Sequence, residues 1–161
     1  MARKCSAPLP TRRRVLAGGV GGMACALVQL RPAHAQELPA DLAAAIRVFA
    51  QGAVVREGRV VLEIAELVDN GNAVPVRVAM EPGLPAGPAV LAMALFNERN
   101  PQREVVTAEF GPRSGGPAFS SRIRLATSQK LVALARLQDG SCWSRTVDVV
   151  VTLAACIEGE G

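Results

Sequence analysis

Two cysteines near the C-terminus, Cys142 and Cys156, are the side chains of this chain best suited to nucleophilic chemistry. The chain has 161 residues, no tyrosine and a single histidine, His34, near its N-terminus. From residue 36 onward there is no imidazole, so a self-contained Ser-His-Asp or Cys-His hydrolase is excluded, as is a histidine-ligated metal site. The sequence also contains no cofactor motif. A thiol is therefore the group to examine first.

A disulfide is the common use of two cysteines in an exported protein. Here the two residues lie 14 positions apart in one segment of extended pattern. At about 3.3 Å per residue their Cα atoms would be roughly 45 Å apart, whereas a disulfide needs about 4.4–6.8 Å. We therefore predict that Cys142 and Cys156 do not pair within one chain.

The two thiols differ in their surroundings. Cys142 adjoins Trp143 at the start of the last predicted strand, and we expect a partly buried thiol near the indole or a bond to another subunit. Cys156 lies five residues from the C-terminus, beyond the last predicted core position. Residues 154–161 are therefore predicted to form a mobile arm. An exposed thiol is a liability in an oxidising compartment, so Cys156 is expected to serve covalent carriage, thiol exchange or a link to another chain.

Residues 1–35 have the features of an export signal. Arg12, Arg13 and Arg14 precede an uncharged stretch rich in Ala and Gly, and Ala33-His34-Ala35 is a small-x-small cleavage pattern. Paired arginines before a mildly hydrophobic stretch are typical of a twin-arginine signal. The stretch of roughly 16 residues is shorter than the roughly 20 that span a bilayer. We predict export to the periplasm, cleavage before Gln36 and no membrane span in the mature protein.

The net charge is concentrated in that same segment. The whole chain has a formal charge of +4, from 18 basic and 14 acidic residues. Six of the basic residues and none of the acidic ones lie within residues 1–35, which leaves 12 basic and 14 acidic residues. The rest of the chain is slightly acidic, so the basic isoelectric point does not indicate nucleic-acid binding.

One helix is predicted, over Leu38–Gln51. Pro39 can open it and Gly52 can close it. Its apolar residues follow a period of 3.6 and form one face, made of Leu42, Ala45, Ile46 and Phe49. A short amphipathic helix of this kind needs a sheet to lie on.

From Arg59 onward the apolar period changes to two, which predicts strands separated by Gly, Pro, Asn and Asp clusters. The fold class is all-β: an immunoglobulin-like antiparallel β-sandwich of about seven strands over residues 36–153, with the helix at its N-terminus. In the last strand Val147, Val149, Val151 and Leu153 should face the core, and Asp139-Gly140 suits a two-residue hairpin turn before it. The seven predicted strands are Val60–Glu66, Val74–Glu81, Ala89–Asn97, Glu104–Phe110, Phe119–Leu125, Lys130–Leu137 and Ser141–Leu153.

Four segments, in this order, resemble the SoxY family, the sulfur carriers of periplasmic thiosulfate oxidation: Glu66–Pro75, Asn100-Pro101, Ser121–Ala126 and Asp139–Ser144. The resemblance covers essentially the whole chain after the leader and includes the terminal cysteine. It implies a sandwich subunit that forms a heterodimer with a second carrier subunit, SoxZ. It also implies that Cys156 carries thiosulfate-derived sulfur while separate Sox enzymes act on it. The chain would then be a carrier and not itself an enzyme, with no metal and no cofactor.

The tail departs from the family pattern, Val-Thr-Val-Gly-Gly-Cys-Gly-Gly. The cysteine is at the corresponding offset, but Ala154, Ala155, Ile157 and Glu158 replace the flanking glycines. These residues are stiffer and bulkier than glycine, so we expect a less flexible arm. Acidic residues in the tail should also disfavour thiolate formation.

Two rival functions remain open. One is a structural or adhesive sandwich module in which Cys156 links subunits through a disulfide. The other is a free-standing sulfurtransferase, which needs a cation near the thiolate; the nearest in sequence is Arg145, at the far end of the strand. Other charged residues are expected to lie on solvated faces: Arg122 and Arg124, for which anion guidance is the alternative, and Glu63 and Glu66.

Overall fold

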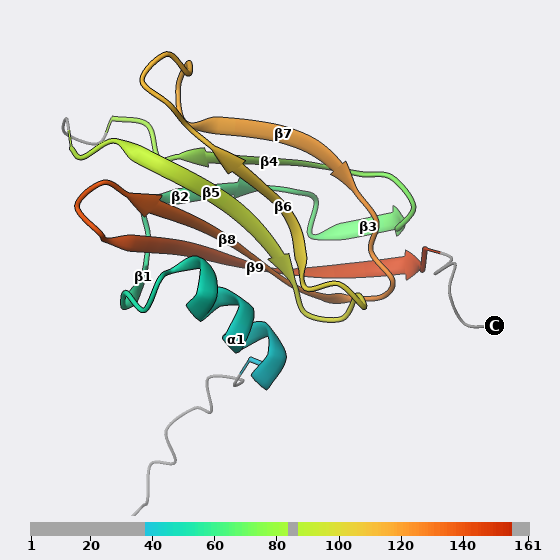
Figure 1. The fold of residues 1–161 in the computed structure, drawn as a ribbon. Coiled ribbons are helices and arrows are strands. Elements are labelled where there is room, and N and C mark those ends of the chain that lie inside the picture. The colour runs from blue at the N-terminus through green and yellow to red at the C-terminus, as the bar shows by residue number, and fades with distance from the viewer. Residues whose placement is uncertain (1–37, 84–86, 156–161) are drawn as a thin grey trace, which may run out of the picture. The chain divides into compact units, whose positions relative to one another are not determined.

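The computed structural model describes residues 38–83 and 87–155, which form one helix and nine strands arranged as a two-sheet sandwich (Figure 1). The predicted all-β sandwich with a short N-terminal helix is confirmed, with nine strands in place of seven. Within those ranges no helix has the length and apolar character needed to span a membrane. The elements are α1 Ala40–Phe49, β1 Val55–Glu57, β2 Val60–Glu63, β3 Leu67–Asn70, β4 Val74–Met80, β5 Val90–Asn97, β6 Glu104–Glu109, β7 Ala118–Ile123, β8 Gln129–Leu137 and β9 Cys142–Leu153.

The larger sheet has the strand order β1-β9-β8-β5-β6, and β3 also pairs with β9. The smaller sheet has the order β2-β4-β7. Pairing is antiparallel throughout the smaller sheet and among β9, β8, β5 and β6, as predicted. The two strands missing from the sequence prediction, β1 and β3, both pair with β9 in parallel. They bond to the edge of β9 that β8 leaves free, β1 near its start and β3 near its end.

The core lies between the two sheets. In β4, Val74, Val76 and Val78 are buried while Pro75 and Arg77 are exposed, which is the alternation of a strand with one solvated face. Strands β5 and β8 are instead buried on both faces over most of their length. A strand covered on both faces has a nearly continuous apolar sequence. Here the second cover is the helix.

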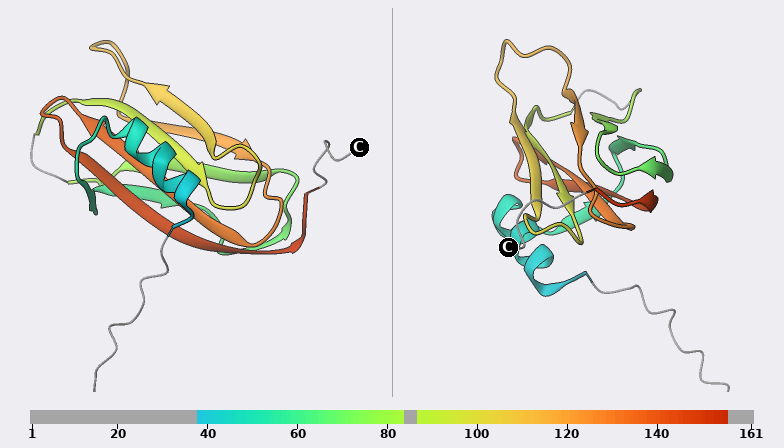
Figure 2. Two further views of the ribbon diagram at one scale, coloured as in Figure 1. Left: turned by 60° about the horizontal axis from the view of Figure 1, so that its bottom comes forward. Right: turned by 90° about the vertical axis from the view of Figure 1, so that its right-hand side faces the viewer.

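Helix α1 lies across the outer face of the larger sheet (Figure 2). Its predicted apolar face is confirmed: Leu42 and Ile46 are buried, and Phe49 packs edge-on against Phe96 with ring centroids 6.0 Å apart. Gly52 follows the helix in the left-handed region, with φ +81°, a conformation that favours glycine. The side chain of Asp41 forms an ion pair of 2.6 Å with Arg103 in the β5–β6 loop, and the hydrogen bond from Arg103 lowers the pKa of that carboxyl.

The β8–β9 turn differs from the prediction. Gln138 and Asp139 form its centre, and the Gly140 N–H donates to the Leu137 carbonyl at 3.1 Å. Gly140 then adopts φ +80°, so the connection is a three-residue hairpin with glycine at the left-handed position, not a two-residue turn on Asp139-Gly140. The Asp139 carboxylate accepts hydrogen bonds from the Ser141 hydroxyl and N–H, which lower its pKa.

The core-facing residues of β9 were predicted correctly except at the end of the strand. Val149 is buried, and Val147 and Val151 are partly buried against the core. Leu153 is 67% exposed. The reason is that β8 pairs with β9 only as far as Val149, so the last residues of β9 extend beyond its neighbour.

We predict that Leu42→Ala lowers the free energy of unfolding by about 2–5 kcal/mol, because it leaves a cavity between α1 and the sheet. Urea denaturation followed by circular dichroism measures this. The matched control is Val48→Ala in the same helix, where the side chain is 78% exposed and a change within about 0.5 kcal/mol is expected. Equal effects of the two substitutions would contradict the docking of the helix described above.

Candidate functional site

Strand β9 connects the two cysteines singled out by the sequence. Cys142 is its first residue, and the chain is described as far as Ala155, two residues past its end. Cys156 itself lies outside the described residues. The twelve residues of β9 form one continuous strand, so Cys142 and Leu153 are separated by about 36 Å. We predict no intrachain disulfide because the chain after Cys142 is expected to be extended. The structure confirms this extended conformation as far as Leu153.

Cys142 is fully buried, not partly buried near the indole as expected. Successive side chains of a strand point to opposite faces, so Cys142 faces α1 while Trp143 faces the space between the sheets. Its neighbours on the helix side include Leu42, Ile46 and Ala50. Among the described residues it is a free thiol, and burial raises its pKa. A neutral, enclosed thiol is neither a nucleophile nor accessible to another subunit.

Trp143 has a structural role at the opposite end of β9 from Ala155. The ring is partly buried against the core, and its N–H donates to the Ser141 hydroxyl at 3.2 Å. The guanidinium groups of Arg59 and Arg56 lie 4.4 and 5.9 Å from the ring centroid. Arg59 adopts φ +59°, an uncommon conformation for a residue with a side chain. Trp143 is thus a core aromatic.

The chain just before Cys156 is held by backbone hydrogen bonds. The Gly71 N–H donates to the Leu153 carbonyl at 2.8 Å, and the Leu125 N–H donates to the Gly71 carbonyl at 2.8 Å. The Ala155 N–H donates to the Leu125 carbonyl at 3.0 Å, and Ala155 is only 6% exposed. We call Gly71, Leu125 and Ala155 the C-terminal clasp. The predicted arm at 154–161 therefore does not begin at residue 154, because Ala155 is buried and hydrogen-bonded; residues 156–161 lie outside the described residues.

The fold brings a closer cation to this end of the chain than the sequence suggested. Arg145, the nearest in sequence, lies ten positions back along the extended β9 from Ala155. Arg124 directly precedes Leu125, whose carbonyl accepts the Ala155 hydrogen bond. The hydrogen bond between Leu125 and Ala155 joins residues 30 positions apart, so the sequence did not indicate that Arg124 lies near the end of β9.

Three of the large apolar side chains that are exposed in the described part of the chain lie near this end: Leu67, Val150 and Leu153. Leu67 and Val150 are register partners across the parallel β3–β9 pair, so they share one face. Val68 and Val151, the next pair, contribute instead to the core. Leu67 and Val150 thus form an exposed apolar pair on one face of the β3–β9 pairing.

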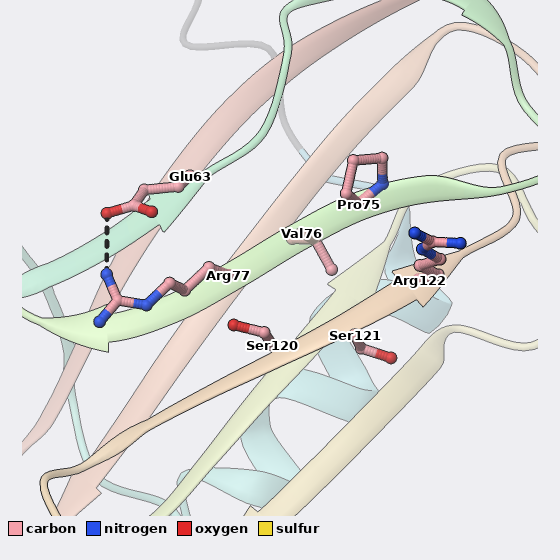
Figure 3. Close-up of a pocket in the computed structure, with 7 residues that line it drawn as sticks. All are labelled: Glu63, Pro75, Val76, Arg77, Ser120, Ser121 and Arg122. Atoms are coloured by element: carbon pink, nitrogen blue, oxygen red, sulfur yellow. Dashed lines mark hydrogen bonds and ion pairs between the residues drawn. The ribbon is translucent and has the colours of Figure 1, made fainter.

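A separate open groove of about 520 Å³ lies on the outer face of the smaller sheet (Figure 3). Arg77 and Arg122 line it, together with Pro75, Ser120 and Glu63. Arg77 is paired with Glu63 at 3.1 Å, and both side chains are about half exposed. Arg122 and Arg124 are exposed while Ile123 and Leu125 are buried, which confirms the prediction of a solvated face. Within the described residues no group of three or more His, Cys, Asp or Glu side chains could hold a metal ion.

We predict that Cys142 resists alkylation in the folded protein. Iodoacetamide should leave the Cys142 peptide unmodified under native conditions and modify it fully in guanidinium chloride, as measured by peptide mass spectrometry. The physical reason is burial, which both encloses the thiol and raises its pKa. Cys156 in the same sample is the internal control. Native-state labelling of both cysteines at similar rates would contradict the placement of Cys142.

Comparison with known proteins shows the family of this chain. The model of the family described as sulfur oxidation protein SoxY matches residues 45–156, so the match ends at Cys156. No curated protein matches the chain. Among solved structures, a superoxide reductase (neelaredoxin) from Ignicoccus hospitalis has 20% identity over 58% of this chain and 80% of its own, with a TM-score of 0.50. A Thermotoga maritima protein described as a superoxide reductase has 19% identity over 64% of this chain and 89% of its own, also at 0.50. These likenesses concern the fold alone, whereas the family match covers most of the sequence: the chain belongs to the SoxY family.

Proposed function

We propose that this protein is a periplasmic sulfur carrier, which binds thiosulfate-derived sulfur covalently on Cys156 and presents it to separate enzymes. The observation that carries the proposal is the family match, which extends to Cys156. The fold is consistent with it, because β9 leads from the sandwich to Ala155, the residue just before Cys156. A reactive sulfur attached there is tethered to a folded body, while Cys142 is enclosed within that body.

The chemistry of such a carrier requires little from its own side chains. In loading, the Cys156 thiolate forms a bond to the outer sulfur of thiosulfate and gives Cys–S–S–SO₃⁻. Two electrons leave in this step, so the loading partner must be an electron-accepting redox enzyme. A hydrolase then adds water, releases sulfate and two protons, and leaves the persulfide on the carrier. Neither step needs an imidazole on the carrier, in keeping with a chain whose single histidine is His34.

We infer two further features from the family and the sequence. A SoxZ-like subunit is the proposed partner in a heterodimer, and the enzymes of the Sox system are the proposed users of the loaded carrier. The twin-arginine leader, residues 1–35, is proposed to deliver the chain to the periplasm in a folded state. Export after folding would allow the partner subunit to bind before transport.

The structural or adhesive module remains the alternative function. In that function Cys156 forms a disulfide between two subunits, and no sulfur compound is carried. The exposed apolar pair Leu67 and Val150 near this end of the sandwich would suit either a subunit contact or an enzyme contact. The state of the Cys156 sulfur in the cell therefore decides between the two.

We predict sulfur adducts on Cys156 in protein isolated from the periplasm of thiosulfate-grown cells. Intact-mass and peptide mass spectrometry should find mass increments of a persulfide and of a thiosulfate adduct on the C-terminal peptide. The adducts should be lost in Cys156→Ser and kept in the matched control Cys142→Ala, because only the first substitution removes the carrier thiol.

The rival functions give different outcomes in the same material. Covalent dimers on non-reducing gels that disappear in Cys156→Ser, with no sulfur adduct, would favour the structural module. Release of sulfite or sulfide from thiosulfate by the purified protein alone would favour a sulfurtransferase. Either result would overturn the carrier function.

A second prediction concerns transport. Replacing Arg12, Arg13 and Arg14 together by lysine should keep the chain in the cytoplasm with its leader uncut, because a twin-arginine signal is recognised by a receptor and not by charge alone. Immunoblots of periplasmic and cytoplasmic fractions measure this, with Arg3→Lys as the control. Normal export of the triple variant would argue against the twin-arginine route.

A further inference from the structure

Three segments that are distant in sequence meet at the C-terminal clasp. Gly71 follows β3, Leu125 follows β7 and Ala155 follows β9. Both backbone polar groups of Leu125 are used there, the N–H toward Gly71 and the carbonyl toward Ala155. Leu125 is also fully buried, so its backbone is held by side-chain packing as well. Ala155, the last described residue, is therefore bonded to a residue that is itself held by hydrogen bonds and by burial.

Gly71 is the residue of the clasp at which a side chain would not fit. A Cβ atom placed there would overlap the Leu125 carbonyl oxygen, the acceptor of the Ala155 hydrogen bond. The same atom would lie 3.1 Å from the Ala155 nitrogen and 3.2 Å from a methyl carbon of Val151. Both backbone groups of the clasp bond would have to move to accommodate it. The absence of a side chain at Gly71 is thus a geometric requirement of the clasp.

Asn100, in the β5–β6 loop, supports the clasp by bonding to the backbone of the residues before and after Leu125. Its side-chain N–H donates to the Arg124 carbonyl at 2.8 Å, and its side-chain oxygen accepts from the Ala126 N–H at 3.1 Å. These two groups flank Leu125 in the chain. The same oxygen accepts a hydrogen bond of 2.8 Å from the buried side chain of Gln129. One amide side chain therefore fixes the backbone on both sides of Leu125.

We propose that Gly71 and Asn100 are positioning residues of the carrier, which hold the pivot of the Cys156-bearing segment at Ala155. This inference rests on the proposed function of Cys156. With the clasp closed, the Cα atom of Cys156 is one step of about 3.8 Å beyond a buried residue. With the clasp open, the next fixed residue is Leu153, and three residues span about 10 Å. The clasp thus shortens the reach of the thiol by about 6 Å.

A short reach selects the kind of enzyme that can use the carrier. A partner with its reactive centre at the end of a deep channel needs a long, thin segment, whereas a shallow centre can meet a thiol held close to the sandwich. The clasp therefore fits partners whose reactive centre lies near their surface. It also limits the conformations that must be fixed when the two proteins dock, which favours productive encounters.

Amide hydrogen exchange of Ala155 in the full-length chain tests the clasp itself. Gly71→Ala and Asn100→Ala should each accelerate this exchange by at least about fivefold, since a backbone hydrogen bond is lost or weakened. If Gly71→Ala fails to fold, Asn100→Ala, which inserts no atom and leaves the Ala155 amide in place, carries the test. Amides of β5 and β8 should be unchanged. An Ala155 amide that exchanges at the unprotected rate in the unsubstituted chain would overturn the proposal.

Two neighbouring substitutions are matched controls. Asn72→Ala removes an exposed side chain that bonds only to Asn70 among the described residues, and Arg99→Ala removes an exposed side chain next to Asn100. Neither side chain contacts the clasp through a described hydrogen bond. Both variants should keep Ala155 exchange within about twofold of the unsubstituted chain, and a fivefold effect in either would remove the specificity claimed for Gly71 and Asn100.

A kinetic comparison tests the positioning role. In a full-length chain with Cys5→Ser and Cys25→Ser, alkylation of Cys156 by iodoacetamide should change less than twofold in Gly71→Ala or Asn100→Ala. Loading from thiosulfate by a periplasmic extract should show a KM for the carrier raised severalfold. Unchanged loading kinetics despite a freed Ala155 amide would overturn the positioning role. Absence of adducts in every variant, the unsubstituted chain included, would overturn the proposed function, while the exchange rates would still decide the clasp.

Discussion

The hydrogen bonding of β9 along both edges is the constraint on which the rest of the structure depends. Strand β8 bonds to one edge, and β1 and β3 bond to the two ends of the other. The first residue of this twelve-residue strand packs under the helix, and its last residue lies outside the sandwich core. Desolvation suppresses the chemistry of Cys142, whereas Cys156 follows the end of the strand in sequence and lies outside the described residues. One extended element thus runs from the enclosed thiol toward the residue that is proposed to carry sulfur.

The fold class could be predicted because apolar periodicity alone determines much of it. The helix face of Leu42 and Ile46 and the alternation along β4 were both visible in the sequence. The two missing strands have physical explanations. Strand β1 has three residues, too few to show a period, and β3 contains Asp69 and Asn70, which are typical of turns. Pairing with β9, more than 80 positions away in sequence, decides the conformation of both, and no local pattern records it.

The chemistry of the candidate site stays a prediction from the sequence, whereas the hydrogen bonds that hold the chain just before Cys156 were not predicted. Eliminating imidazole chemistry indicated a thiol, and the position past the last strand indicated Cys156. The clasp could not be predicted, because its hydrogen bonds join backbone groups that lie at least 30 positions apart in sequence. A partial signal did exist. Three of the segments that resemble the SoxY family, Glu66–Pro75, Asn100-Pro101 and Ser121–Ala126, contribute Gly71, Asn100 and Leu125 to it. The sequence alone did not indicate that these segments contact one another, and the fold brings them together beside Ala155.

The likeness to superoxide reductases concerns the fold and not the function. A shared fold permits different chemistry, because function belongs to the site attached to it. In this chain the proposed site is a single sulfur atom, so the fold can affect its chemistry mainly through position. Fixing one residue of backbone costs about 1–2 kcal/mol. A clasp that already holds Ala155 lowers the entropic cost of docking by about 1–2 kcal/mol, and it shortens the reach of the thiol. An open clasp would lengthen the reach of the thiol but raise the entropic cost of docking, and a closed clasp does the opposite. In the proposal, Gly71 and Asn100 are the residues that set this balance.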